Sequence, residues 1–432
     1  MTESTGIIIN CKFKVKSNIG SMLSSPVLKQ EVPASNLGHK STQRVVSIDI
    51  LRALIMVLMI FVNDLWSLHN IPLWLEHVAP GVDGIGLADT VFPAFLFIVG
   101  LSLPFAIDNR RNKGDSQWEL VKHVLTRSIA LLVMGVFLVN GETLNADAMG
   151  MQPNVYDALC CISFILIWNL YPKTFNKNIV YLLKFIGIAS LITLAILYRG
   201  KENGIIERFA PHWWGILGLI GWSYLAAGLI TVFAKNKFSV IISAWIFFCV
   251  LSMAAKAGFV PGLILNYIPE SISGGTLAGL TMGGVLTSLI FQYFRAKKNN
   301  KRLTLFYLAF SVLLITLSIV TRPYWKLAKL GATPAWLFLC SAFTILAFLA
   351  IYWITDVYGK ANWFKIIKPA GTDTLLCYLM PYFVYFLLTI FHFTLPEAIL
   401  SGGVGLLKSL LFAILCVFIA GKLNKLGVRL KL

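Results

Sequence analysis

Long apolar segments recur along almost the whole of this sequence, and they constrain its fold more than any other feature. Short polar connectors separate them, and most segments are long enough to cross the roughly 30 Å hydrocarbon core of a bilayer. Two of them, 155–171 and 238–255, are short and could be partly re-entrant. We predict twelve spans, at residues 45–66, 85–107, 121–141, 155–171, 178–198, 213–234, 238–255, 274–294, 303–320, 334–354, 369–392 and 403–421.

The composition excludes a soluble globule with a polar surface. Hydrophobic residues make up 57% of the chain, charged residues only 13%, and soluble domains carry about twice that charged fraction. The net charge of +18 does not indicate nucleic-acid binding, because Lys and Arg lie mostly in short loops, where they set membrane topology. We therefore predict an all-α, polytopic membrane helix bundle.

The distribution of Lys and Arg predicts the orientation. Alternate connectors form two sets, with 21 basic residues on one side and 7 on the other. Cytoplasmic loops carry the excess of positive charge, so we expect both termini in the cytoplasm. The segment 1–44 is polar and lacks the apolar core of a signal peptide, so we predict that it is a disordered cytoplasmic tail. Residues 45–421 would form the transmembrane domain, and residues 422–432 a basic cytoplasmic tail.

The cysteine pattern indicates neither a disulfide framework nor a zinc site. Six of the seven cysteines lie inside apolar segments, and Cys11 lies in the tail. We interpret the six as small packing residues and expect no metal.

The connector between the first two spans is rich in groups that can move protons or hold a polar ligand, and it is predicted to face outward. Such residues at the ends of membrane helices are costly unless they face a cavity or a partner, which favours a functional site over a merely solvated loop. The polar residues in or beside this connector are Asn63, Asp64, His69, Glu76, His77, Asp83 and Asp89.

His77 is the leading catalytic candidate in that connector. An imidazole can take a proton from an attacking amine or hydroxyl, or accept an acyl group itself, and a neighbouring carboxylate could orient its ring. A structural role for this histidine stays open. The Asn63 amide could stabilise an oxyanion or simply cap the first helix.

Asp49 and Arg52 are one helical turn apart at the opposite end of the first span, so they share a face and can pair. They either anchor that helix or bind a phosphorylated ligand from the cytoplasm. The run ISGGTLAGLTMGGVL at 272–286 has the small-residue spacing that lets membrane helices approach closely, and it could also contact a ligand through its backbone.

Three motifs carry a resemblance to a known family. The segments SIDILRALIMVLMIFVND, WLEHVAPGVDGIGLAD and TVFPAFLFIVGLSL, within residues 44–110, resemble the heparan-alpha-glucosaminide N-acetyltransferase family, particularly its bacterial NagX-like members. Two further segments resemble the family less closely: IPESISGGTLAGLTMGG at 268–284 and KPAGTDTLLCYLMPY at 368–382. The resemblance implies a multi-pass protein of the bacterial cytoplasmic membrane that moves acetyl from cytoplasmic acetyl-CoA to the amine of an amino sugar such as glucosamine.

The resemblance also assigns roles to residues. His77 and Asn63 match the family's catalytic pair. We expect Asp64, Asp83, Asp89 and Glu76 to contact the acceptor, and Arg52, Asp49, Gly275 and Asp373 to contact acetyl-CoA. The chain departs from the family in its longer connector between Asn63 and His77, in Ala53 after the first-helix arginine, and in Asp373, where a GxN motif is usual.

A different class of function remains open. A proton-coupled secondary transporter for a sugar or amino sugar would also have about twelve spans and buried charges, although residues 230–432 show no repeat of the 46–107 pattern. A nonenzymatic membrane sensor is a third reading. No Walker loop, dinucleotide fingerprint, HExxH pair or GxSxG elbow appears in a suitable context. Besides acetyl-CoA, the amino sugar and lipid, a second copy of the chain is a possible partner.

Overall fold

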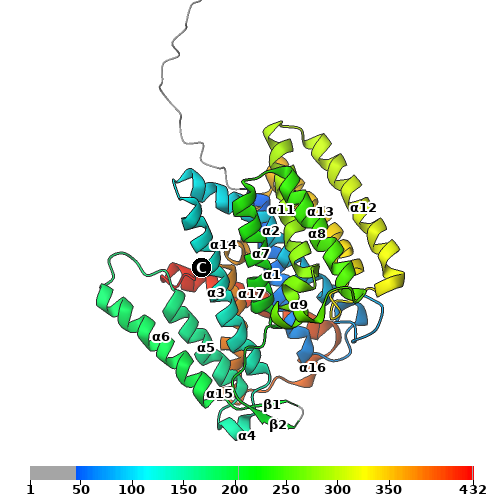
Figure 1. Cartoon of the computed structure of the whole chain (residues 1–432). Helices are drawn as coiled ribbons and strands as arrows, with labels where there is room; N and C mark the ends of the chain where they lie inside the picture. The colour runs from blue at the N-terminus through cyan, green and yellow to red at the C-terminus, as the bar shows by residue number, and fades with distance from the viewer. Residues whose placement is uncertain (1–44, 203, 431) are drawn as a thin grey trace, which may run out of the picture. The chain divides into compact units, whose positions relative to one another are not determined.

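The computed structural model describes residues 45–202, 204–430 and 432, and these fall within one compact helical unit. The predicted tail at 1–44 lies outside the described residues. Each of the twelve predicted spans contains a long helix (Figure 1). These helices are α1 (Val46–Asp64), α2 (Leu87–Asn112), α3 (Gln117–Glu142), α5 (Pro153–Trp168), α6 (Lys177–Leu197), α7 (Ile216–Ala234), α8 (Phe238–Lys256), α11 (Thr276–Ala296), α12 (Asn300–Trp325), α13 (Pro334–Tyr352), α15 (Thr374–Ile390) and α17 (Gly402–Lys425).

Short elements fill the connectors. Two of them depart from the all-α prediction: the strands β1 (Gly200–Glu202) and β2 (Ile205–Glu207) pair as an antiparallel hairpin. The other short elements are η1 (Leu65–Ser67), η2 (Leu73–Leu75), α4 (Ala146–Met149), α9 (Gly262–Tyr267), α10 (Glu270–Ser273), the π-helix η3 (Trp353–Val357), η4 (Ala361–Phe364), α14 (Lys368–Thr372) and α16 (Glu397–Leu400).

The polytopic architecture is confirmed, with ten described helices long and apolar enough to cross a membrane. Helices α5 and α15 are apolar but shorter, at 16 and 17 residues. The predicted span at 369–392 is divided, because the backbone of Asp373 leaves the helical conformation between α14 and α15. At the end of the chain α17 runs past residue 421 to Lys425.

Helix α11 lies in the core, where Thr276 to Phe291 are all buried. A side chain on Gly284 would collide with the backbone oxygen of Phe97, and one on Gly100 with that of Thr281. Helices α2 and α11 therefore meet backbone to backbone, which confirms the prediction that the small residues at 272–286 allow close helix packing.

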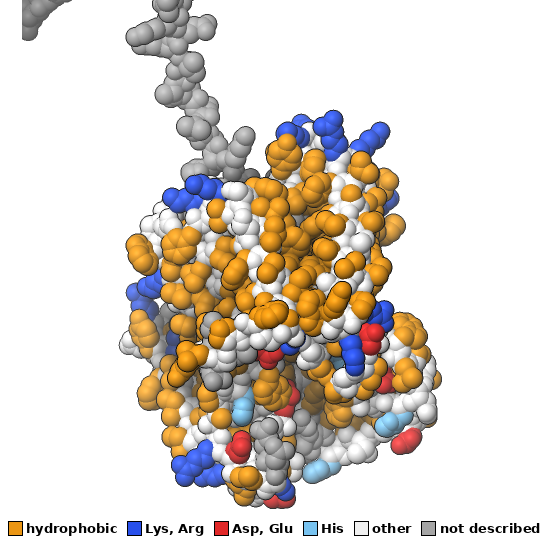
Figure 2. All heavy atoms as spheres, turned by 45° about the vertical axis from the view of Figure 1, so that its right-hand side comes forward, with side chains coloured by type: hydrophobic (Ala, Val, Ile, Leu, Met, Phe, Trp, Pro, Cys, Tyr) orange, Lys and Arg blue, Asp and Glu red, His pale blue; other side chains and the backbone are white. Residues whose placement is uncertain are grey.

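Charged groups differ between the two ends of the bundle in the view of Figure 2. Several Lys and Arg side chains lie at the top edge and others lie lower down, hydrophobic side chains cover much of the surface between them, and the histidines and acidic groups visible in this view lie in the lower half. The six described cysteines are free and buried, in line with packing roles.

Candidate active site

His77 and Asp89 form the central contact of the connector between α1 and α2. Nδ1 of His77 lies 2.7 Å from Oδ1 of Asp89, and the backbone N–H groups of Val78 and Gly86 donate to Oδ2 at 3.1 Å. The Asp89 side chain is 2% exposed and that of His77 46%. Because a carboxylate accepts hydrogen bonds only, Nδ1 carries the hydrogen and Nε2 faces away with its lone pair in the neutral ring.

The backbone of this connector is tightly folded around Asp89. Gly86 precedes α2, and a side chain there would collide with the backbone oxygen of Glu76. The Trp336 indole Nε1 donates to the backbone oxygen of Asp89 at 3.0 Å, which joins the start of α13 to the start of α2. The His77 ring is therefore presented by a rigid loop.

Asp83 attaches the connector to the segment between α12 and α13. Both of its carboxylate oxygens lie 3.1 Å from Nε of Arg322, and the Leu327 N–H donates to Oδ1 at 2.7 Å. The Leu327 hydrogen bond, with a smaller contribution from Arg322, holds the pKa of Asp83 below its usual value.

That attachment brings a lysine to the histidine. Nζ of Lys329 lies 3.3 Å from Nδ1 and 3.4 Å from Nε2 of His77. Burial lowers the pKa of Lys329, while the charge of Asp89 acts in the opposite direction. The imidazole thus lies between an acidic and a basic side chain.

A cavity of about 480 Å³ opens beside this group, and we call it the His77 cavity. Asn63 lines it together with His77. The C-cap of α1 is Leu65, so Asn63 is not the helix cap that the sequence left open as an alternative. Other charged residues on its wall are Glu142, Lys256, Glu270 and Lys329.

A second cavity of about 570 Å³, the Arg52 cavity, lies toward the start of α1. Arg52 donates from Nη1 to Asp49 at 3.2 Å and to the backbone oxygen of Gly371 at 3.1 Å. Gly371 has no room for a side chain, because its Cβ would collide with the backbone oxygen of Asp49. The predicted pairing of Asp49 with Arg52 is confirmed, and it links α1 to α14.

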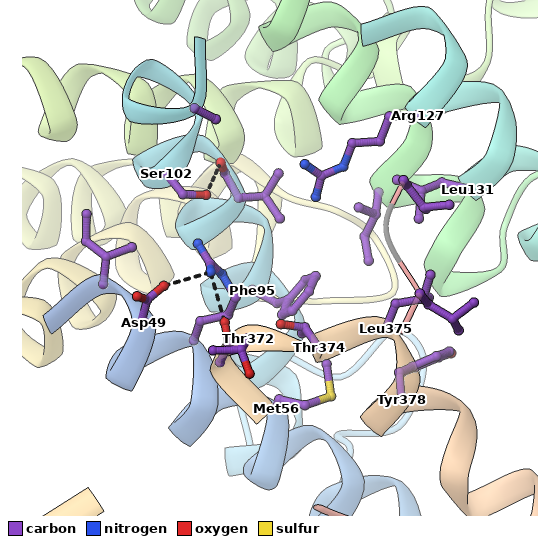
Figure 3. Close-up of a pocket in the computed structure, with 18 of the residues that line it drawn as sticks. Asp49, Met56, Phe95, Ser102, Arg127, Leu131, Thr372, Thr374, Leu375 and Tyr378 are labelled. Carbon is purple, nitrogen blue, oxygen red and sulfur yellow. Dashed lines mark hydrogen bonds and ion pairs between the residues drawn. The ribbon is translucent and has the colours of Figure 1, made fainter. Parts of the chain in front are cut away.

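Arg127 of α3 adds a second guanidinium to the Arg52 cavity. Figure 3 shows Asp49 and Arg127 on opposite sides of that cavity. The Arg127 guanidinium lies 4.7 Å above the ring centre of Tyr224, and its buried Nε makes no hydrogen bond within the described residues.

The two cavities share two wall residues, Met59 of α1 and Ile216 of α7. Met59 is 3% exposed. The His77 cavity and the Arg52 cavity therefore adjoin inside the bundle, and the side chains at the point where they meet are apolar.

Several residues predicted to contact ligands lie elsewhere. Asp64 is 2% exposed and accepts hydrogen bonds from Tyr385, Lys408 and Ser409 at 2.6–2.8 Å. This satisfied group ties α1 to α15 and α17. Asp64 does not line either cavity described here.

Glu76, Asp83, Gly275 and Asp373 are likewise absent from the walls of both cavities. Gly275 directly precedes α11 and has φ 71°, and its neighbours Gly274 and Thr276 do line the His77 cavity. Asp373 is 7% exposed and accepts a hydrogen bond from the Thr372 hydroxyl at 2.9 Å.

A family model described as "Domain of unknown function (DUF5009)" matches residues 44–273, more than half of the chain. The chain belongs to this family. The match includes Asn63, His77 and Asp89, whereas Lys329 and Gly371 lie outside it.

Two curated relatives agree with the resemblance read from the motifs. The heparan-alpha-glucosaminide N-acetyltransferase of Mus musculus is 31% identical over 129 residues, which cover 28% of this chain and 18% of that protein. The Homo sapiens protein of the same name is 29% identical over 131 residues, which cover 29% of this chain and 18% of that protein. The resemblance is thus confirmed, and the chain matches less than a fifth of the length of either relative.

Sequence reasoning did not assign Lys329 and Arg127 to a site, because it used their charges only to predict topology. Lys329 lies in a connector and Arg127 in α3, and neither position gave a further signal, since the residues that share their cavities, His77 and Arg52, are far away in sequence. A lysine next to the start of an apolar span, on the side with few basic residues, was the one available hint for Lys329.

Proposed function

We propose that this chain is a transmembrane N-acetyltransferase, which moves acetyl from cytoplasmic acetyl-CoA to the amine of glucosamine or a related amino sugar at the outer face. The observation that carries the proposal is the pair of adjoining cavities. One holds a histidine oriented by a buried carboxylate, and the other holds two arginines. The similarity to named N-acetyltransferases supports the same reaction class.

The Arg52 cavity has the chemistry to hold acetyl-CoA. Guanidinium groups bind phosphates well, and Arg127 has a buried Nε that is still without a hydrogen-bond acceptor in the described structure. Arg52 and Arg127 would hold the nucleotide phosphates, and the pantetheine arm would pass Met59 and Ile216 toward His77. The apolar side chains at that point suit an uncharged arm.

His77 would then handle the proton of the acceptor amine. In direct transfer, Nε2 takes a proton from the amine as its nitrogen bonds to the acetyl carbon. The carbon–sulfur bond breaks, and the ring returns the proton to the departing thiolate. In the two-step alternative Nε2 itself attacks the acetyl carbon and the CoA thiolate departs; the amine then attacks the same carbon, the bond to Nε2 breaks, and the ring nitrogen takes up the amine proton. Asp89 holds the ring in the required tautomer in both routes, and Asn63 can donate to the carbonyl oxygen.

The test uses purified protein in detergent with labelled acetyl-CoA and glucosamine. We expect labelled N-acetylglucosamine from the wild type and from His69→Ala, a control histidine in the same connector that lines neither cavity. His77→Ala should lose at least a hundredfold of the rate. Equal turnover by His77→Ala would contradict the proposed site.

A proton-coupled sugar transporter is the second candidate. The observation that favours it is the same pair of cavities, since two compartments separated by a thin apolar contact also suit alternating access. Uptake of labelled glucosamine into vesicles without any acetyl donor would support the transporter, and uptake equal to that of empty vesicles would exclude it.

A further inference from the structure

Lys329 approaches the face of the His77 ring. Its Nζ is 3.3 Å from Nδ1 and 3.4 Å from Nε2. In the ring plane, a point equally distant from both nitrogens would collide with the carbon between them, so the amine lies above the ring. Nδ1 also contacts Asp89 at 2.7 Å. The acid and the amine therefore reach the imidazole from different directions, and Nε2 stays open to the cavity.

The position of Lys329 is fixed by contacts that involve neither its own amine nor the His77 ring. The Gly84 N–H donates to the Leu327 backbone oxygen at 2.9 Å, and the Leu327 N–H donates to Asp83 at 2.7 Å. Lys326 donates to the Gly81 backbone oxygen at 3.0 Å. These hydrogen bonds hold the connector between α1 and α2 against the connector between α12 and α13, and this places the Lys329 amine against the His77 ring.

Among the charged residues that line the His77 cavity, Lys329 is the basic group that contacts the His77 ring. Lys256 pairs with Glu270 at 3.6 Å, and Glu142 of α3 lines the wall. Lys329 is half-buried. A partly desolvated ammonium interacts more strongly with a developing negative charge than one in water does.

We propose that Lys329 is a catalytic group of the His77 cavity, whose ammonium donates a hydrogen bond to the carbonyl oxygen of an acyl group that reacts at Nε2 of His77. This inference rests on the proposed acyl transfer. A carbonyl oxygen lies about 1.2 Å beyond its carbon, and N–H···O bonds span about 2.7–3.2 Å. An amine 3.4 Å from Nε2 therefore reaches the oxygen of an acyl group on that nitrogen.

The step balances without any further reactant. When a nucleophile adds to the carbonyl carbon, an electron pair moves onto the oxygen, and the Lys329 hydrogen bond strengthens. When the bond to the leaving group breaks, the pair returns to form the carbonyl again, and the leaving group departs with the electrons of its bond. Lys329 keeps its proton throughout.

The ester p-nitrophenyl acetate tests this role without acetyl-CoA or sugar. The readout is the nitrophenolate release that His77→Ala abolishes. We expect Lys329→Met to lower kcat about a hundredfold, as for loss of one oxyanion donor, with little change in KM. Lys329→Arg keeps a cationic donor and should stay within about tenfold of the wild type. Lys201→Met is the control, because Lys201 is an exposed lysine of β1 that lines neither cavity, and it should not change the rate.

Three results would overturn the inference: equal kcat for Lys329→Met and the wild type, no His77-dependent nitrophenolate release at all, or acetyl found by mass spectrometry on Lys329 instead of His77. Melting temperatures separate chemistry from folding, and Lys329→Gln provides a second variant if the methionine variant unfolds. If the wild type shows the expected ester results but no turnover of acetyl-CoA, the proposed function fails while the role of Lys329 stands.

Discussion

Met59 of α1 and Ile216 of α7 line both the His77 cavity and the Arg52 cavity. This shared wall makes the two cavities neighbours although one contains the histidine and the other the two arginines. If an acyl donor bound at the arginines is to reach the histidine, its arm must pass these two side chains.

Enlarging Ile216 should therefore obstruct the donor. We expect Ile216→Trp to lower acetyl transfer from acetyl-CoA at least tenfold, while His77-dependent hydrolysis of p-nitrophenyl acetate, which can enter at the His77 cavity, stays near the wild-type rate. Ile230→Trp, on the same helix but lining neither cavity, serves as the control. An equal fall in both reactions would contradict a passage between the cavities.

Arg127 should recognise the phosphates of the donor. For Arg127→Gln we expect a KM for acetyl-CoA about ten- to a hundredfold higher, because a charge-assisted phosphate contact is lost. The KM for acetyl-pantetheine, which lacks the nucleotide phosphates, should not change. Steady-state kinetics with both donors make the comparison, and a matching rise for acetyl-pantetheine would indicate a structural effect instead.

Asp89 should act through the orientation of the His77 ring. Asp89→Asn keeps the size of the side chain but can donate to Nδ1, which favours the wrong tautomer. We expect kcat for acetyl transfer to fall by about a hundredfold or more, with KM for acetyl-CoA nearly unchanged. Glu76→Gln, in the same connector and lining neither cavity, should retain most of the activity, and equal losses in the two variants would refute a specific role for Asp89.

Asp83 should make the stability of the connector depend on pH. Its pKa is held below the ordinary value by Leu327 and Arg322, so its contribution is fully present above the pKa of an unfolded aspartate, about 3.9. The contribution disappears as the pH falls through the lower folded-state pKa. The melting temperature of Asp83→Asn should lie roughly 1–3 °C below wild type at pH 7, and the gap should close in acid. A gap that stays constant from pH 7 down to the lowest pH at which the wild type is folded would contradict this.

The sequence was informative about helices and about residues close together in the chain. Apolar runs located the spans because each must be long enough for the bilayer, and the one-turn spacing of Asp49 and Arg52 predicted their ion pair. The glycines of α11 likewise predicted close packing with another helix, although not that the partner is α2.

Contacts between distant segments could not be read in this way. Lys329 meets His77 across 252 positions of sequence, and Arg52 meets Gly371 across 319. Asp64 looked like part of a polar loop, but Lys408, 344 positions away, makes it half of a buried ion pair. Periodicity and spacing describe one segment at a time, so they could not show which charges are satisfied by a partner and which face a cavity.

The central claim is that acetyl enters on one side of the membrane and reaches the amine on the other. The most direct measurement places labelled acetyl-CoA outside sealed vesicles in which the protein exposes the Arg52 cavity to the outside, with glucosamine trapped within. We predict labelled N-acetylglucosamine inside the vesicles with the wild type and none with His77→Ala. Product that forms only when donor and acceptor share one compartment, or that forms equally with His77→Ala, would contradict the account.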